Sequence, residues 1–320
     1  MVVNLYIFNF KSVKKLLYSI LFVISILFGI DRIGAEILWS INQHANSQSN
    51  IKIRDVVYRT NADVVLMGTS RTGCNYVSSI IADSINLSVY NAGIDASECI
   101  FSHYYLLNHL LKRYKPKMIC LELWSMDYTN NMNPYNGLRM FGPYFGIERK
   151  SDSLFYYSDD WWPYTISHLS RYNSVIASDI YSLFSKKQIS ADGYLPLPTP
   201  EDLLDKPISQ IRSNDINSLK LITLQKFIDV CKESNIELLF TISPIYAYIE
   251  KGEYYPLYKI AKENSIMLFD YHSKELFLDE PTCFYDVVHL CNEGAEKFTQ
   301  IFAHDLKEYL NSSHNNDLMN

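Results

Sequence analysis

Short apolar runs that alternate with helical patterns constrain the fold of this chain most strongly. Between the runs, apolar residues recur at helical spacing, as in Leu106, Leu107, Leu110 and Leu111. Strands that alternate with helices predict a parallel sheet covered by helices on both faces. We therefore expect an α/β fold, a three-layer α/β/α sandwich with a roughly five-stranded parallel sheet. The runs that predict buried strands are residues 63–67, 88–91, 118–123, 237–242 and 266–270.

Between about residues 128 and 215 this alternation breaks down. The segment is rich in Tyr, Phe and Trp, interleaved with Asn, Asp, Gly and Pro. We interpret it as an insertion over the carboxyl ends of the strands, where open α/β sheets bind ligands. Exposed rings there, with Trp161 as a candidate, can stack on sugar rings. The alternative is that the rings form a small core of the insertion's own.

The N-terminus carries a targeting signal. Three lysines precede an uncharged apolar run of about 15 residues, 16–30, slightly shorter than the ~17–25 residues of a bilayer span. Flanking lysines can snorkel and extend the effective span. No small-x-small cleavage site follows, so we favour an uncleaved signal anchor over a cleaved signal peptide or a buried core helix. The lysines are Lys11, Lys14 and Lys15.

These features predict a single-pass protein of the cell membrane. Because the lysines precede the apolar run, the N-terminus is expected in the cytoplasm and the main domain in the periplasm or outside the cell. The expected parts are the N-terminus and anchor (1–31), a juxtamembrane connector (32–58), the α/β domain (59–311) and a disordered tail (312–320).

Composition narrows the classes of partner. A net charge of -6 argues against nucleic-acid binding, which usually leaves a basic footprint. We expect no cofactor, since no phosphate-binding Gly-rich loop is present, and no metal, since His103 and His109 are not at i, i+4 spacing. In an exported protein Cys283 and Cys291 can form a disulfide, but sequence spacing does not decide this.

Two short motifs near opposite ends of the chain point to chemistry. The run at 64–67 leads directly into Gly68-Thr69-Ser70-Arg71, which places Ser70 at a helix N-terminus, where backbone N–H groups favour negative charge. Ser70 is therefore a candidate nucleophile whose own N–H helps to hold an oxyanion, although serine also serves as a helix cap. Downstream, Asp286 precedes His289 by three residues and would orient it as general base and then general acid.

Together these motifs resemble the SGNH hydrolases, or GDSL-like esterases. Gly68-Thr69-Ser70 is similar to the first block of that family. Asp286, His289, Leu290 and Gly294 are similar to its last block, Asp-x-x-His-Leu-x-x-x-Gly. The resemblance covers residues 60–127 and 220–310. It implies an SGNH/flavodoxin-like sandwich with a Ser-His-Asp triad. In the family's second block a glycine after the next strand donates its N–H to the oxyanion, and here this is Gly93.

The third block departs from the family pattern. It usually carries Gly-x-Asn-Asp, whose asparagine donates to the oxyanion, but here the strand runs on through residues 121–127 without that glycine or asparagine. Ser125 is the candidate replacement. Since losing one oxyanion donor costs about 10²–10³ in rate, an inactive protein that keeps the fold is the alternative.

Residues 69–71, the anchor and the large insertion are similar to a membrane-anchored subset of this superfamily. That subset acts in cell-envelope polymer acylation and includes the teichoic-acid D-alanine transfer protein and the alginate acetylation proteins. The resemblance implies a serine esterase or acyltransferase acting on acyl esters, in particular acetyl esters, of cell-envelope or extracellular polysaccharide. The alternative is an inactive accessory protein that binds glycan or partners a membrane O-acyltransferase.

Three residues are candidates for substrate binding. Arg71 can hold an anionic or polyhydroxyl substrate, or it is simply a solvated helix residue. The aromatic candidates are Trp124 and Trp161.

Overall fold

The computed structural model describes residues 10–95, 97, 99–130, 133–185, 189–202, 206–209, 215–248 and 252–317. Its central feature is a parallel sheet in the order β2-β1-β3-β5-β7. Each of the five expected strands is present, and the predicted fold class is confirmed. The strands are β1 (Val64–Met67), β2 (Val89–Asn91), β3 (Met118–Glu122), β5 (Glu237–Ile242) and β7 (Met267–Asp270).

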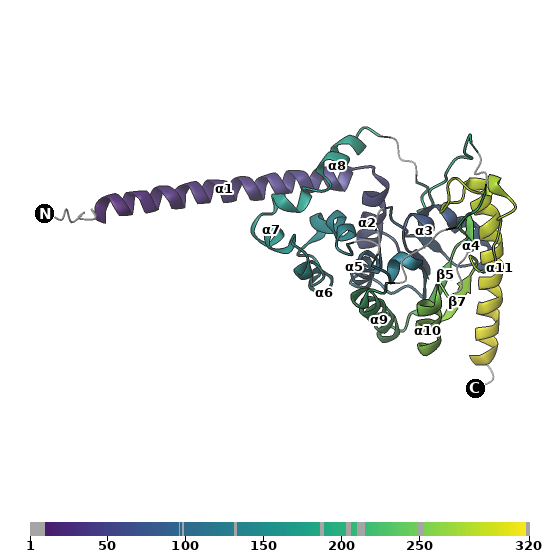
Figure 1. Ribbon diagram of the computed structural model, residues 1–320. Helices are drawn as coiled ribbons and strands as arrows, with labels where there is room; N and C mark the ends of the chain where they lie inside the picture. The colour runs from purple at the N-terminus through teal and green to yellow at the C-terminus, as the bar shows by residue number, and fades with distance from the viewer. Residues whose placement is uncertain are drawn as a thin grey trace.

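Helices cover both faces of the sheet because alternate strand residues point to opposite sides. Val65 and Ile119 pack with α2 (Gln48–Tyr58), α5 (Ile100–Leu111), α9 (Ser218–Glu233) and α10 (Tyr255–Glu263). Their neighbours Val64 and Met118 pack with α4 (Ser78–Ile85) and α11 (Asn292–Asp317) on the other face. Figure 1 shows the sheet between these two layers, with α11 along one side of the domain. A separate parallel pair, β4 (Ile208–Ser209) and β6 (Ala247–Tyr248), lies outside this sheet.

The N-terminal apolar run lies within one long helix, α1 (Phe10–His44), whose first half projects away from the domain (Figure 1). It is the one helix among the described residues that is long and apolar enough to cross a membrane. The apolar stretch is 0% buried within the protein, so the alternative of a buried core helix is wrong.

The expected connector at 32–58 is also not a separate linker. Residues 32–44 continue α1, and α2 buries Ile53 and Val56 in the main core, so the α/β domain begins before residue 59. At the other end, α11 extends to Asp317, since each further residue of an established helix adds a hydrogen bond. The expected disordered tail is therefore helical over residues 312–317, and 318–320 lie outside the described residues.

The insertion is built from short helices: η1 (Ser125–Asp127), η2 (Asn136–Tyr144), α6 (Arg149–Asp152), η3 (Phe155–Tyr157), α7 (Trp161–Ile166), η4 (Leu169–Tyr172) and α8 (Ile176–Ser182). Its inner rings pack against α5 and α1. The ring centroids of Tyr105 and Phe141 are 4.7 Å apart, and those of Trp39 and Tyr144 are 5.4 Å apart. The prediction that the aromatic segment covers the carboxyl ends of the strands is therefore wrong for this part of the insertion. Its inner rings pack against one another and against α5 instead.

A later stretch of the insertion does reach the carboxyl edge of the sheet. The Asp192 carbonyl accepts the N–H of Asn91 at the end of β2 (2.8 Å), and the Leu197 carbonyl accepts the N–H of Asn292 at the start of α11 (2.8 Å). This stretch therefore joins β2 to the beginning of the last helix.

Candidate active site

The turn between β1 and the helix α3 (Ser70–Asn75) presents Ser70. Thr69 is the N-cap: its hydroxyl accepts the Arg71 N–H at 3.4 Å, which leaves the Ser70 side chain for another partner. Gly68 makes the turn possible with a φ of +153°, and a Cβ there would lie 2.0 Å from the Thr72 hydroxyl oxygen. The alternative in which Ser70 caps the helix is therefore not what the structure has.

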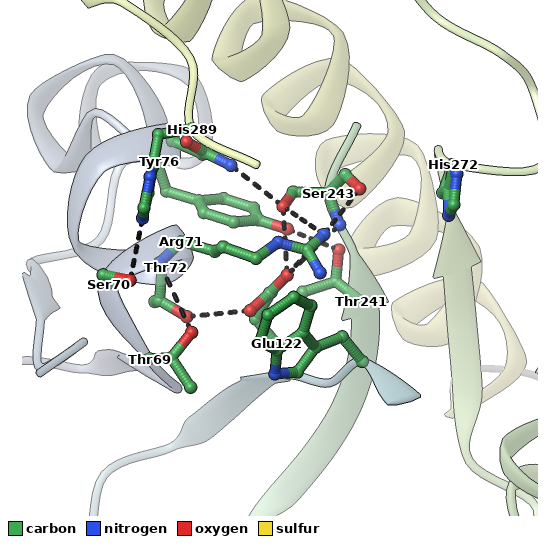
Figure 2. Close-up of polar contacts among 12 residues, drawn as sticks. Thr69, Ser70, Arg71, Thr72, Tyr76, Glu122, Thr241, Ser243, His272 and His289 are labelled. Carbon is green, nitrogen blue, oxygen red and sulfur yellow. Dashed lines mark hydrogen bonds and ion pairs between the residues drawn. The ribbon is translucent and has the colours of Figure 1, made fainter. Parts of the chain in front are cut away.

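The structure brings Ser70, His289 and Asp286 together. Nε2 of His289 lies 2.8 Å from Oγ of Ser70, and its Nδ1 lies 2.9 Å and 3.0 Å from the two carboxylate oxygens of Asp286. Figure 2 shows the His289 ring directed at the Ser70 hydroxyl across the start of α3. The nucleophile–base–orienter distances are those of a Ser-His-Asp triad.

The environment of Asp286 keeps it charged. Burial by itself would raise the pKa of this carboxyl. Hydrogen bonds from the His289 ring and from the backbone N–H groups of Val288 (2.8 Å) and His289 (2.9 Å) outweigh that effect and lower the pKa below its usual value. A charged Asp286 accepts an N–H of the His289 ring at Nδ1, which leaves Nε2 to accept from Ser70.

A buried asparagine joins the serine helix to the histidine loop. Oδ1 of Asn75, the last residue of α3, accepts the Leu290 N–H at 2.9 Å. Its Nδ2 donates to the Ser243 hydroxyl at 3.0 Å. Asn75 is fully buried, so these bonds fix the residue next to His289 relative to Ser70. Sequence reasoning missed this residue, because the polar run 70–75 carries no local pattern that singles it out.

The order of the blocks along the sheet decides the type of fold. Ser70 follows β1, Gly93 follows β2, and the Asp-His pair precedes the last helix at the same edge of a 2-1-3-5-7 sheet. The fold is SGNH-hydrolase-like.

Comparisons with solved structures are distant. A lipolytic protein of the G-D-S-L family from Desulfitobacterium hafniense DCB-2 matches at 10% identity with a TM-score of 0.37, over 75% of this chain and 97% of that one. A gut microbial diltiazem-metabolizing enzyme matches at 16% identity with a TM-score of 0.29, over 75% of this chain and 45% of its own. No protein-family profile and no curated protein matches the chain.

The turn that resembles the second SGNH block follows β2 as expected, but the N–H of its glycine already has a hydrogen-bond partner. The Gly93 N–H donates to Oδ1 of Asn91 at 3.0 Å, while Nδ2 of Asn91 donates to the Thr72 and Tyr76 carbonyls at the end of α3. The expectation that Gly93 offers its N–H to an oxyanion is therefore not met in this arrangement, because the buried Asn91 needs that donor. Gly93 itself is required for close packing, since a Cβ there would lie 2.4 Å from the Gly73 nitrogen.

A lysine from α2 supports the same turn. The ammonium of Lys52 donates a hydrogen bond to the Gly93 carbonyl, and the side chain is completely buried. Burial lowers the pKa of Lys52 to about 8, although Cys74, Asp95 and Asp192 oppose the shift. Helix α2 thus holds the turn after β2 in position.

The third SGNH block is replaced by a buried ion pair. Nη2 of Arg71 lies 3.0 Å from Oε1 of Glu122 at the end of β3, and it donates to the hydroxyl and carbonyl oxygens of Ser243 (both 2.8 Å). Figure 2 shows Arg71 extending away from Ser70 toward these groups. Burial raises the pKa of Glu122, which the charge of Arg71 opposes. Sequence reasoning missed Glu122, whose signal was a single carboxylate in an apolar strand.

Arg71 is therefore neither a solvated residue nor an exposed substrate ligand. Only 1% of it is exposed, and its role is to fasten α3 to the carboxyl ends of β3 and β5. Trp124 stays near this pair, since the Arg71 guanidinium carbon lies 5.2 Å from the centroid of its ring.

The two other candidates are Ser125 and Trp161. Ser125 is buried at the start of η1, where its carbonyl accepts the Thr129 hydroxyl (2.7 Å), and among the described residues no hydrogen bond joins it to Ser70. Trp161 belongs to α7, which Figure 1 shows beside α1 and apart from α3. Its place on the other flank of the domain gives no support to Trp161 as a substrate ligand, while Ser125 as an oxyanion donor stays a prediction.

Cavities of about 430 Å³ and 320 Å³ lie against the insertion, and neither is lined by Ser70 or His289. Ser70 is half-buried. Cys283 and Cys291 are both free thiols. Within the described ranges, no group of three His, Cys, Asp or Glu side chains is placed to hold a metal ion.

Proposed function

We propose that this protein is a serine esterase or acyltransferase in which Ser70 attacks an acyl ester. His289 takes the Ser70 proton as general base, and the ester carbon forms a tetrahedral intermediate that collapses to an acyl-enzyme with release of the alcohol. His289, now charged and supported by Asp286, returns the proton to the leaving alkoxide. Water or a second hydroxyl then takes the acyl group by the reverse sequence.

The observation that carries this proposal is the contact between Ser70 and His289. Their side chains lie 2.8 Å apart and come from opposite ends of the domain, with the Asp286 carboxylate on the far nitrogen of the ring. The Ser70 N–H supports the oxyanion, because the first N–H groups of a helix have no carbonyl partner within it.

The substrate we propose is an acyl ester, in particular an acetyl ester, of a cell-envelope or extracellular polysaccharide. The Ser70 side chain is half-buried and so partly exposed, as attack on an ester of a polymer requires. The exposed apolar stretch of α1 supports a bilayer anchor. The lysines before it favour export of the domain to the outer side of the membrane, where such polymers lie.

The test is turnover of a simple acetyl ester, p-nitrophenyl acetate, by the full chain in detergent. Ser70→Ala should reduce kcat/KM by about 10³-fold or more without a change in the free energy of unfolding. Ser84→Ala is the matched control, since Ser84 lies on α4 and its hydroxyl donates to the Ala303 carbonyl. Equal turnover by Ser70→Ala and the unaltered protein would rule out this function. With an acetylated polysaccharide, loss of polymer-bound acetyl groups tests the substrate class.

Two observations favour a second candidate, an inactive accessory protein that binds glycan or partners a membrane O-acyltransferase. The Gly93 N–H already bonds to Asn91, and Glu122 lies in the strand that leads into the altered third block. Such a protein would bind an acetylated polysaccharide with equal affinity before and after Ser70→Ala and would turn over no ester.

A further inference from the structure

A group of large apolar side chains is exposed on one part of the insertion. Five of the eleven residues from 156 to 166 carry such side chains, between 41% and 73% exposed. The rings of Tyr156 and Trp161 pack edge to face with centroids 5.9 Å apart. We call this set the aromatic ridge: Tyr156, Tyr157, Trp161, Trp162 and Ile166. Exposed apolar patches of this kind on a folded protein mark interaction surfaces.

The ridge is fastened to α1 at the end of its apolar run. The Asp31 carboxylate, the first charge after that run, accepts the N–H of His168 (2.9 Å), the N–H of Leu169 (3.2 Å) and the hydroxyl of Ser167. Arg32 donates to the carbonyl of Ile166, the last residue of α7 (3.4 Å). The ridge therefore lies at the height on α1 where the apolar stretch gives way to charge. Figure 1 shows α7 as the part of the domain nearest the projecting half of α1.

The apolar surface of α1 extends past Asp31. Ile30, Ile33 and Ile37 are 57%, 67% and 57% exposed, and their spacing places them on one side of the helix. An apolar run of about 15 residues rises only about 22 Å, less than the ~30 Å hydrocarbon core of a bilayer. A bilayer spanned by α1 would therefore reach the isoleucines beyond Asp31 and the side chains fastened beside them.

We propose that the aromatic ridge lies in the interfacial region of the bilayer that α1 spans and forms a second contact with lipid. Trp and Tyr favour this region because an apolar ring there keeps its polar N–H or O–H near water. The partner is lipid rather than glycan, since Asp31 and Arg32 hold the ridge at the height on α1 where the apolar run ends. The inference rests on the proposed membrane anchor, not on catalysis.

The inference fixes the orientation of the domain. From Asp31 to His44, α1 rises roughly 20 Å. Figure 1 shows α3, with Ser70, beyond the end of that segment and on the opposite flank from α7. With α1 along the bilayer normal and the ridge at the interface, the triad faces away from the lipid.

The test is tryptophan quenching in liposomes that contain the full chain. In a Trp39→Phe/Trp124→Phe variant only Trp161 and Trp162 contribute tryptophan fluorescence, because the chain has four tryptophans. Lipids brominated near the headgroup end of their acyl chains should remove most of this fluorescence, and lipids brominated near the chain ends should remove less. The matched control, Trp39→Phe/Trp161→Phe/Trp162→Phe, reports on Trp124 alone and should keep its intensity.

Flotation of the same liposomes separates the possible failures. Protein that floats with lipid while Trp161 and Trp162 remain unquenched would overturn the ridge contact and leave the anchor standing. Protein that does not float would overturn the anchor and with it the inference. Fluorescence that lipid leaves unchanged but an added polysaccharide alters would assign the ridge to glycan and overturn the lipid contact. Loss of ester turnover in these variants would bear only on the proposed function.

Discussion

The guanidinium of Arg71 lies 3.0 Å from the carboxylate of Glu122, and both side chains are 99% removed from solvent. Arg71 directly follows Ser70, so this ion pair connects α3 to the centre of the sheet. In an SGNH-like fold the chain after β3 is expected to supply an oxyanion donor. Here the last residue of that strand carries half of a buried charge pair.

Breaking this pair should destabilise the protein. Glu122→Gln leaves an unpaired buried guanidinium, which should lower the free energy of unfolding by about 3–5 kcal/mol in urea denaturation. The double variant Arg71→Met/Glu122→Leu removes both charges and should lose less than Glu122→Gln alone. A double variant that loses the full sum of the two single changes would contradict this account of the ion pair.

Asn75 should matter for rate as well as for stability. Asn75→Ala leaves the buried Leu290 N–H without its acceptor, so we expect a loss of about 1–3 kcal/mol in unfolding free energy and a lower kcat as His289 loses its fixed position. Asn108→Ala is the control, since Asn108 is also buried and donates to the Tyr104 carbonyl on α5. It should cost stability but leave kcat unchanged. Equal effects on kcat would show that Asn75 does not position His289.

Asp286→Asn tests the orientation of the imidazole. The amide cannot support a charged ring, so the turnover number for p-nitrophenyl acetate should fall by about 10²–10⁴-fold. Stopped-assay kinetics on this variant and on Asp286→Glu measure the effect, and the glutamate should restore part of the rate. Asp83→Asn, an exposed change on α4, should have no effect. Unchanged turnover in Asp286→Asn would remove the carboxylate from the mechanism.

Lys52 should make stability depend on pH in the alkaline range. Its folded pKa of about 8 lies below the usual 10.5, so the folded state releases its proton first. The stability that neutral Lys52 contributes is fully present above pH 10.5 and is lost as the pH falls through 8. The free energy of unfolding changes by about 3 kcal/mol over this window, at 1.36 kcal/mol per pKa unit.

The measurement is the unfolding free energy of wild type minus that of Lys52→Met across this window. We expect the difference to rise with pH. For comparison, Lys226→Met changes an exposed lysine of α9 and should give a curve parallel to wild type. Parallel curves for Lys52→Met as well would show that Lys52 is not buried beside Gly93.

The sheet was predictable because apolar runs such as 64–67 and 237–242 have no other place to be buried than between two helical layers. The meeting of Ser70 and His289 followed from the same pattern, since the carboxyl ends of parallel strands share one edge. Both predictions depended on local patterns and one topological rule.

The supporting residues could not be predicted in this way. Arg71 and Ser243 are 172 positions apart, and Lys52 and Gly93 are 41 apart, so neither partner carries a local pattern that names the other. The aromatic content of the insertion indicated rings in need of partners. It did not indicate that the partners would be α5 and α1 instead of the strand ends, which is why Trp161 was assigned to the substrate.

The central claim is that Ser70 is an activated nucleophile, and covalent labelling tests it most directly. The full chain is treated with a fluorophosphonate and examined by intact-mass and peptide mass spectrometry, beside Ser70→Ala and His289→Gln. The account predicts one adduct, on Ser70, absent from Ser70→Ala and formed much more slowly in His289→Gln. A folded protein that takes up no label, or one labelled equally after Ser70→Ala, would contradict it.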